Sequence, residues 1–264
     1  MTQKPQDACD MMNALALKVR GLSLDLAGKR LLDDVSFDIS RGCLASVIGP
    51  NGAGKTTLLK CLCRLTEEWK GSIEAFGRDV RNLSRLEMAR LFGYVPQFHE
   101  SPPDYDVEEF LEMSRFAVGH DDERAAIDDA LELVGLTSLR HRSMETLSGG
   151  ECQKAFVAAG LVQNTPMLLL DEPAAFLDPK YQLEIRRLLV KLCRERGLTI
   201  LCVTHDINSA IACSDVLLAL DGGCLKFIGT PEEILQNRRI DELFGVEFER
   251  MVNASGQTVV VPEG

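Results

Sequence analysis

Short runs of apolar residues alternate with amphipathic segments along most of the chain, which is the pattern of a mixed α/β fold. The runs at 44–48 (LASVI), 167–170 (MLLL) and 198–202 (LTILC) have the length and composition of strands buried on both faces of a parallel sheet. Residues 15–48 also contain short strands around a Gly28-Lys29 turn, which indicates an antiparallel layer. The chain is therefore expected to form an α/β core that carries an antiparallel β subdomain.

Helix signals gather in the middle of the chain and again near its end. A capping box at 84–87 (SRLE) opens a helix that continues to Leu91. The pattern is helical from Val107 to Ala117 and from Glu123 to Val134. Residues 230–233 (TPEE) are another strong helix start, with a threonine cap, proline at the first helical position and glutamate at the third.

These signals divide the sequence into a core and an insertion. A cluster of breakers at 101–104 (SPPD) separates the core pattern from the helical pattern. We expect a helical subdomain at residues 98–160, inserted into a core formed by 14–97 and 161–264, with all three segments in one domain. Residues 1–13 are predicted to be a mobile N-terminal tail.

A phosphate-binding loop follows the first buried run directly. Its motif is G-x-x-x-x-G-K-T between a strand and a helix, and the loop comprises Gly49, Pro50, Asn51, Gly52, Ala53, Gly54, Lys55, Thr56 and Thr57. The glycines let the backbone N–H groups point at phosphate oxygens, and the following helix adds its positive end. Lys55 is expected to bridge the β- and γ-phosphates of a nucleotide, and the Thr56 hydroxyl to ligate Mg²⁺.

Two carboxylates end the second buried run. Asp171 and Glu172 follow four apolar residues, and a strand buried on both faces would not end in two acids for stability alone. Asp171 is placed to hold Mg²⁺ through water, and Glu172 is free to polarise the attacking water as general base. A pair of solvated acids that starts a loop is the alternative, and the upstream phosphate-binding loop argues against it.

Two further strand ends carry side chains that can sense a γ-phosphate. Gln97 closes the short strand 94–96 (YVP), and its neutral amide can contact Mg²⁺ or the water. His205 follows the third buried run, and its imidazole can donate a hydrogen bond to the γ-phosphate. Taken singly, each side chain is weak support for a site, because a lone Gln or His at a strand end is more often an ordinary polar residue.

A second glycine-bearing turn, 147–151 (LSGGE), lies between the phosphate-binding loop and the acidic strand end. Ser148 is a good N-cap for the helix that begins here, so Ser148, Gly149 and Gly150 can form a second anion cradle. A plain glycine-rich helix start is the alternative. In this order, the motifs resemble those of the ATP-binding cassette (ABC) ATPases, and the resemblance covers nearly the whole chain.

The resemblance implies a P-loop NTPase (RecA-like) core with an antiparallel β subdomain and an inserted α-helical subdomain. It makes Gln97 the Q-loop residue, His205 the switch histidine and Asp178 the acid of the D-loop. It also implies a head-to-tail homodimer, in which the turn Ser148–Gly150 of one copy closes over the ATP that the other copy's P-loop holds.

Three positions depart from the family pattern. Cys152 stands where Arg or Gln is more usual, and Ala174 stands where Thr or Ser is common. Leu26 takes the position of the aromatic residue that normally stacks on adenine. Because base stacking on an aromatic ring is worth roughly 1–3 kcal/mol in single-strand nucleic-acid sites, this departure bears on base affinity and on selection of ATP over GTP.

Composition and charge narrow the class further. At 264 residues the chain can bury a sizeable core, and no run approaches the roughly 18–20 apolar residues of a membrane span. The N-terminus lacks the apolar region of a signal peptide. The formal net charge of −11 argues against nucleic-acid binding by broad electrostatics. Nine scattered cysteines fit reduced thiols in a cytoplasmic protein.

The leading hypothesis is an ATPase subunit on the cytoplasmic side of a membrane, with ATP and Mg²⁺ as its ligands. The segment 178–189 and the ending 229–249 look most like importers of iron-siderophore, haem or cobalamin, which implies integral membrane permease subunits and a substrate-binding protein as partners. The alternative is a soluble cassette ATPase that acts as a switch in iron-sulfur cluster assembly or cell division. A P-loop kinase would have no use for the second glycine turn.

The segment Phe98–Asp106 is the predicted docking surface for the membrane partner. It follows Gln97 directly, and its apolar residues include Tyr105, with acidic residues as a polar rim. The alternative is a solvated loop between subdomains. Trp69 is expected to be a packing residue.

Overall fold

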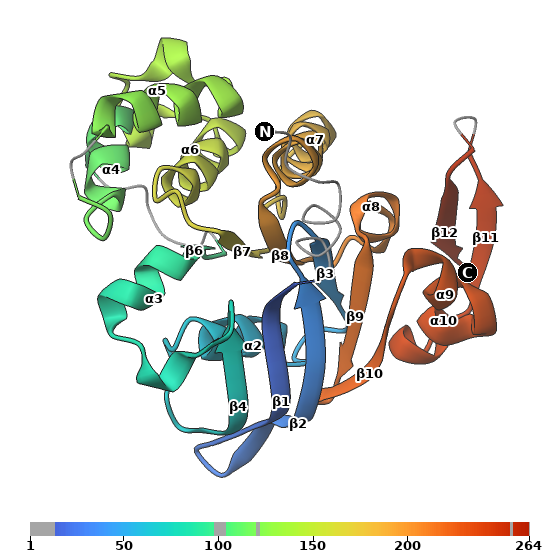
Figure 1. Cartoon of the computed structure of the whole chain (residues 1–264). Coiled ribbons are helices and arrows are strands. Elements are labelled where there is room, and N and C mark those ends of the chain that lie inside the picture. The colour runs from blue at the N-terminus through green and yellow to red at the C-terminus, as the bar shows by residue number, and fades with distance from the viewer. Residues whose placement is uncertain (1–13, 98–103, 120–121, 254–255, 264) are drawn as a thin grey trace, which may run out of the picture.

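The computed structural model describes residues 14–97, 104–119, 122–253 and 256–263. The core is a six-stranded sheet with the order β10-β9-β3-β8-β7-β6 (Figure 1). All neighbours in it are parallel except the edge pair β9 and β10. The strands are β3 (Leu44–Ile48), β6 (Phe92–Val95), β7 (Met167–Asp171), β8 (Thr199–Val203), β9 (Val216–Asp221) and β10 (Cys224–Gly229).

The three apolar runs form neighbouring central strands, β3, β8 and β7, as the sequence predicts. Alternate residues of β7 enter different hydrophobic clusters, Met167 and Leu169 on one face and Leu168 and Leu170 on the other. This double burial is the reason that the run 167–170 contains no polar residue on either face.

An antiparallel sheet with the order β2-β1-β4-β5 packs beside the core, which confirms the predicted antiparallel layer. Its strands are β1 (Leu15–Leu26), β2 (Lys29–Ser40), β4 (Trp69–Ala75) and β5 (Arg78–Asp79). The strands β1 and β2 are each 12 residues long, longer than the short strands that the sequence suggests, because β-bulges let them bend without ending. Trp69 is buried in the core cluster, as predicted.

Helices cover the sheet and form a separate group at one end of it. The helices of the core are α2 (Lys55–Leu62), α3 (Arg85–Leu91), α7 (Pro179–Arg196) and α8 (Ile207–Cys213). The group that Figure 1 shows in green and yellow consists of α4 (Val107–Ser114), α5 (Glu123–Val134) and α6 (Gly149–Leu161). The chain also makes single 3₁₀ turns at Val80–Asn82, Thr137–Leu139, Met144–Thr146 and Gln236–Arg238.

The predicted helix starts are confirmed by their capping geometry. Ser84 caps α3 and Thr230 caps α9 (Pro231–Leu235), each with a reciprocal capping box. The helix α5 has the predicted bounds, whereas the prediction that α4 continues to Ala117 is wrong, because α4 ends at Ser114. After Ser114 the backbone makes i→i+3 hydrogen bonds, and the buried side chain of Arg115 donates to the carbonyl of Val162.

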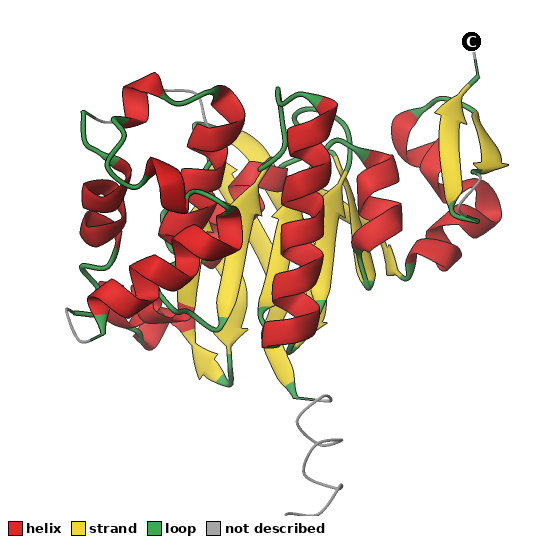
Figure 2. Cartoon of the chain, turned by 90° about the horizontal axis from the view of Figure 1, so that it is seen from above, coloured by secondary structure: helices red, strands yellow, loops and turns green. Residues whose placement is uncertain are grey.

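The last part of the chain packs against α8 at the end of the molecule away from α4–α6 (Figures 1 and 2). It consists of α9 (Pro231–Leu235), α10 (Arg239–Phe244) and a hairpin of β11 (Phe248–Val252) and β12 (Thr258–Pro262). The side-chain amide of Asn208 donates to Val260 O at 3.0 Å and accepts from Val260 N at 2.8 Å, which attaches the hairpin to α8.

The described residues leave some predictions untested. The tail 1–13 and residues 98–103 of the predicted docking segment lie outside the described residues, and the boundaries at 97/98 and 160/161 stay predictions. Tyr105 is 42% exposed, and its carbonyl accepts from Met144 N. Among the described helices, none combines the length and the apolar composition that crossing a bilayer requires.

Candidate active site

The phosphate-binding loop connects β3 to α2 at the carboxyl end of the parallel strands. Its conformation depends on glycine at two positions. Gly49 has φ 148°, and a Cβ there would stand 1.9 Å from Leu220 O. Gly54 has φ 99°, and a Cβ would approach Leu31 O to 2.8 Å. The sequence therefore folds into a loop whose backbone approaches other strands closely, which is the arrangement that exposes N–H groups to an anion.

The Lys55 side chain lies over this loop. Its Nζ donates to Gly49 O at 2.8 Å and to Pro50 O at 3.1 Å. Burial lowers the pKa of Lys55, and the nearby carboxylates of Glu172 and Asp171 oppose that shift. The ammonium is thus partly desolvated and faces the mouth of the loop, so a phosphate that replaced the two carbonyl contacts would gain an ion pair in a medium of low polarity.

Thr56 and Asp171 meet although they are far apart in sequence. The Thr56 hydroxyl donates to Asp171 Oδ1 at 3.1 Å, and Asp171 is only 1% exposed. Desolvation raises the pKa of Asp171, while the hydrogen bond from Thr56 lowers it. The other carboxylate oxygen, Oδ2, has no hydrogen-bond partner among the described residues. A buried carboxylate with one unsatisfied oxygen is costly unless a cation joins it.

These oxygens fit a magnesium ion. Mg²⁺ prefers hard oxygen ligands, and it commonly binds through one or two protein oxygens together with waters and substrate phosphates. Within the described residues no group of three or more His, Cys, Asp or Glu side chains could hold a metal ion. The two oxygen ligands that Thr56 and Asp171 offer are too few for a resident metal centre. They fit a Mg²⁺ ion that arrives bound to a nucleotide.

Glu172 is the meeting point of the remaining polar side chains. Gln97 Nε2 donates to Glu172 Oε2 at 3.1 Å, and His205 Nδ1 lies 3.3 Å from the same oxygen. Gln97 follows β6, Glu172 follows β7 and His205 follows β8, so the parallel sheet brings the three to one edge. Glu172 also has φ 51°, a left-handed conformation that costs energy for a glutamate and often occurs at functional sites.

One cavity of about 860 Å³ unites the phosphate-binding loop with these three side chains. Its other walls come from the start of β2 and from residues that the sequence analysis did not single out. The lining residues are Lys29, Arg30, Leu31, Asn51, Gly52, Ala53, Gly54, Lys55, Thr56, Thr57, Gln97, Glu172, Phe176, His205, Gly222 and Gly223. The adjacent glycines at 222 and 223 are a turn signal in the sequence that could have marked this wall.

Several predicted site residues do not line this cavity. Among the described residues around it, the turn residues Ser148, Gly149 and Gly150 are absent, as is Asp178, which is the N-cap residue of α7. Leu26 is also absent from the lining and is 49% exposed. The nearby residues that do line the cavity are Lys29, Arg30 and Leu31 at the start of β2. The cavity and the predicted anion cradle at Ser148–Gly150 are thus separate within one chain, and position 26 contributes no aromatic residue to the cavity wall.

The predicted anion cradle is the glycine turn before α6. Ser148 Oγ accepts from Glu151 N at 3.4 Å, and Glu151 Oε2 accepts from Ser148 N at 2.9 Å, which completes a capping box. This pair lowers the pKa of Glu151, because the carboxylate accepts hydrogen bonds from Ser148. Ser148 and Gly149 are exposed at the helix N-terminus, whereas Gly150 is buried. An anion could approach this turn from outside the chain.

Comparison with known proteins identifies the family. Residues 32–175 match the family described as ABC transporter. The matched segment includes both the phosphate-binding loop and the glycine turn. The chain belongs to the ABC transporter family. It is an ATPase of that family, and its segment 147–151 (LSGGE) is called the signature turn below.

Curated relatives cover almost the full length of this ABC protein. The petrobactin import ATP-binding protein FpuC of Bacillus anthracis is 37% identical, and the match covers 83% of this chain and 82% of that protein. The iron(3+)-hydroxamate import ATP-binding protein FhuC of Bacillus subtilis is 34% identical, with 90% of each chain covered. The ferric enterobactin transport ATP-binding protein FepC of Escherichia coli is 33% identical over 96% of this chain and 97% of that protein.

Solved structures share the fold. The cbiO1 protein of Clostridium perfringens, described as part of the ABC transporter complex cbiONQ, superimposes with a TM-score of 0.77 at 28% identity and covers 87% of this chain and 94% of that chain. The dimeric structure of MJ0796, a bacterial ABC transporter cassette, gives a TM-score of 0.73 at 26% identity over 81% of this chain and 98% of that chain. These similarities confirm the predicted RecA-like α/β fold.

Proposed function

We propose that this chain is the nucleotide-binding subunit of an importer for iron-siderophore, haem or cobalamin, and that it hydrolyses MgATP to drive transport. The convergence of Gln97, Glu172 and His205 at the mouth of the phosphate-binding loop supports the assignment of the chemistry. The names of the curated relatives, which include importers of petrobactin, ferric hydroxamate and hemin, support the class of solute.

The chain's own side chains divide the reaction between them. The backbone of Gly49–Thr57 and the Lys55 ammonium hold the phosphates, while Thr56 and Asp171 supply oxygens for Mg²⁺, whose role is to neutralise charge on the β- and γ-phosphates. Glu172 accepts the proton of the attacking water as general base, and Gln97 orients its carboxylate. His205, whose Nδ1 lies 3.3 Å from Glu172 Oε2, donates a hydrogen bond to the γ-phosphate in this proposal.

The signature turn supplies the missing contacts from a second copy. In the proposed head-to-tail homodimer, Ser148, Gly149 and Gly150 close over the ATP held by the other copy, and Asp178 lies near the interface. The absence of these residues from the lining of the described cavity supports contacts in trans. We assign residues 98–160 to the subdomain that carries this turn, with 14–97 and 161–264 as the core.

The proposal places the subunit on the cytoplasmic side of a membrane. Its partners there are integral permease subunits that work with a substrate-binding protein, and the docking segment is Phe98–Asp106. The apolar side chain of Tyr105 and the acids Asp104 and Asp106 give this segment the character of an interface with a polar rim. The names of the relatives favour transport over the alternative of a soluble switch in iron-sulfur assembly or cell division.

Co-purification tests the transport assignment. The full-length chain, tagged and expressed in its native cell, is expected to isolate an integral membrane protein from detergent-solubilised membranes, and the Tyr105→Ala variant with Phe98→Ala is expected to lose it. ATP hydrolysis by the isolated variant should remain, which controls for folding. Recovery of a soluble partner instead would support the switch hypothesis and contradict the proposal.

A further inference from the structure

Gly150 of the signature turn packs against an aromatic ring of its own chain. A Cβ built on Gly150 would stand 2.4 Å from Cγ of Tyr181, and 2.5 and 2.7 Å from the two Cδ atoms. Gly149 differs, because a Cβ there would meet nothing within 4 Å. Only a residue without a side chain can occupy position 150 while the ring stays in place, whereas position 149 is sterically open toward its own chain.

The contact extends along the first turns of two helices. Tyr181 lies in the first turn of α7, and four residues after Gly150 the Lys154 Nζ lies 5.5 Å from the centre of the Tyr181 ring. Lys154 also forms an ion pair with Glu184, three residues after Tyr181, and this pair lowers the pKa of Glu184. Residues at these spacings share one helix face, so the start of α6 and the start of α7 face each other.

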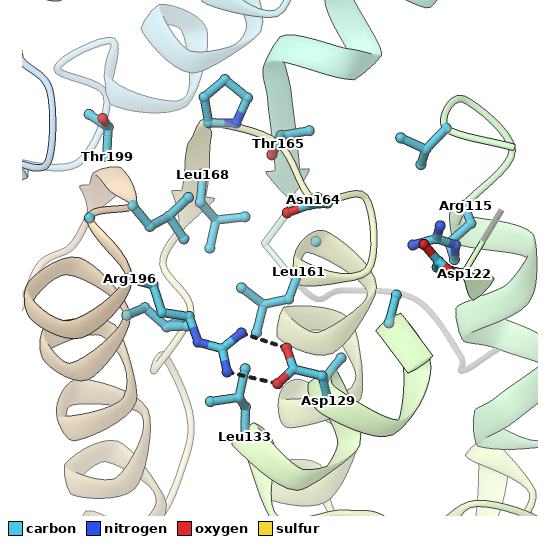
Figure 3. Close-up of a pocket in the computed structure, with 18 of the residues that line it drawn as sticks. Arg115, Asp122, Asp129, Leu133, Leu161, Asn164, Thr165, Leu168, Arg196 and Thr199 are labelled. Atoms are coloured by element: carbon cyan, nitrogen blue, oxygen red, sulfur yellow. Dashed lines mark hydrogen bonds and ion pairs between the residues drawn. The ribbon is translucent and has the colours of Figure 1, made fainter. Parts of the chain in front are cut away.

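A second connection joins α7 to the same helical group at its other end. Arg196, the last residue of α7, forms a bidentate ion pair with Asp129 of α5, with N–O distances of 2.5 and 2.7 Å. Figure 3 shows this pair at one side of a cavity of about 840 Å³ that separates α5 from the core. The helix α7 is therefore attached to the helical group near both of its ends.

The first turn of α7 directly follows the hydrolytic residues. Glu172 directly follows β7, Asp178 is the N-cap of α7, and Tyr181 comes three residues later. A displacement of the first turn of α7 moves the ring of Tyr181, and this ring contacts the signature turn at Gly150. The signature turn, in contrast, serves the nucleotide of the partner copy.

We propose that Tyr181 is a positioning residue that seats the signature turn on α7, and that glycine is required at position 150 by this ring. The ring thereby connects the acidic strand end of one ATP site with the signature turn that acts at the other site. This inference rests on the proposed head-to-tail function. It assigns the two glycines of the turn different tasks: Gly149 leaves room for the partner's phosphate, and Gly150 leaves room for Tyr181.

Suppression of one substitution by another tests the steric requirement. Gly150→Ala is expected to reduce ATP turnover by roughly 10²-fold, because a displacement of about 1 Å in a positioning group has an effect of that size. Adding Tyr181→Ala removes the ring atoms that the new methyl group meets, so the double variant should be more active than Gly150→Ala alone. A double variant no more active than Gly150→Ala would overturn the inference, since glycine would then be required by the nucleotide.

A second measurement separates positioning from general packing. Tyr181→Ala in the full-length chain should bind ATP with unchanged affinity, lose turnover by a clearly smaller factor than Gly150→Ala does, and lower the Hill coefficient for ATP toward one. Tyr181→Phe keeps the ring and should behave like the wild type in all three. Wild-type turnover and Hill coefficient in Tyr181→Ala would overturn the inference. A wild-type chain that does not hydrolyse ATP would instead contradict the proposed function, so the two failures are distinguishable.

Discussion

Gln97 Nε2 donates a hydrogen bond to Glu172 Oε2 at 3.1 Å, although the two residues are 75 positions apart in the sequence. The contact links the strand end that precedes the helical insertion to the carboxylate that we propose as general base. His205 Nδ1 lies 3.3 Å from the same oxygen. One carboxylate oxygen is thus shared by two side chains that were each expected to face a γ-phosphate, which makes Glu172 the centre of the site.

The first prediction concerns that carboxylate. Glu172→Gln keeps the size of the side chain and removes the base, so ATP hydrolysis should fall by roughly 10²–10⁴-fold while MgATP binding survives. Trapping of bound ATP should also stabilise the dimer. A phosphate-release assay measures turnover, and light scattering with and without MgATP measures the dimer. Near-normal turnover would remove Glu172 from the role of base.

The second prediction divides binding from hydrolysis. Lys55→Ala removes the ammonium at the mouth of the phosphate-binding loop, so affinity for ATP should fall together with activity. His205→Ala should bind ATP nearly as well as the wild type and turn over slowly, because His205 lies beside Glu172 and not on the loop. Equilibrium binding of a fluorescent ATP analogue, set beside turnover, checks both. Equal loss of affinity in the two variants would contradict this division.

The local parts of the fold and the site were predictable from the sequence. Each capping box, buried apolar run and glycine pattern is a signal that extends over only a few residues. The roles of Ser84 and Thr230 as helix caps and the place of Lys55 in the phosphate-binding loop could therefore be predicted from local sequence alone. The order of the parallel strands then brings Gln97, Glu172 and His205 to one edge, since each follows a strand of the same sheet.

Contacts between distant side chains were not predictable in the same way. The contact between the Tyr181 ring and Gly150 depends on how α6 and α7 pack against each other, and no local sequence pattern predicts this packing. The end of α4 at Ser114 coincides with a hydrogen bond from buried Arg115 to the carbonyl of Val162, 47 residues away in the sequence. The wall formed by Lys29, Arg30 and Leu31 depends on how the antiparallel layer meets the core.

The third prediction concerns pH and magnesium. Desolvation raises the pKa of Asp171 above its ordinary value of 3.8, so between that value and the raised pKa the folded state binds more protons than the unfolded state. The contribution of Asp171 to the free energy of unfolding therefore falls as pH rises through this window. Without nucleotide, Asp171→Asn should melt at a higher temperature than the wild type near neutral pH, and the difference should shrink toward the acid end of the folded range.

Magnesium should reverse that order. MgATP stabilises a protein that binds it in the folded state only, and the Asp171 carboxylate is an expected ligand of the ion. At about pH 7, MgATP should therefore raise the melting temperature of the wild type by more than that of Asp171→Asn. This increase should be lost when EDTA removes the metal. Thermal scans at two pH values check this. An Asp171→Asn variant with an undiminished gain would exclude Asp171 from the metal site.

The last prediction tests whether the signature turn acts on the partner's nucleotide. Gly150→Asp would not decide this, because its side chain would collide with Tyr181 in the same chain. Gly149→Asp is the cleaner variant, since position 149 is exposed and open within 4 Å. Its carboxylate should repel the γ-phosphate across the interface, so the homodimer should be inactive.

A heterodimer of Gly149→Asp with Lys55→Ala then separates the two geometries. If the turn acts in trans, both lesions fall in one composite site and the other site keeps an intact P-loop and an intact turn. Differently tagged copies, purified as the heterodimer, should then trap ATP in one of their two sites, whereas each homodimer should trap none. If the turn acted within its own chain, each site would carry one lesion, and the heterodimer would be as inactive as its parents.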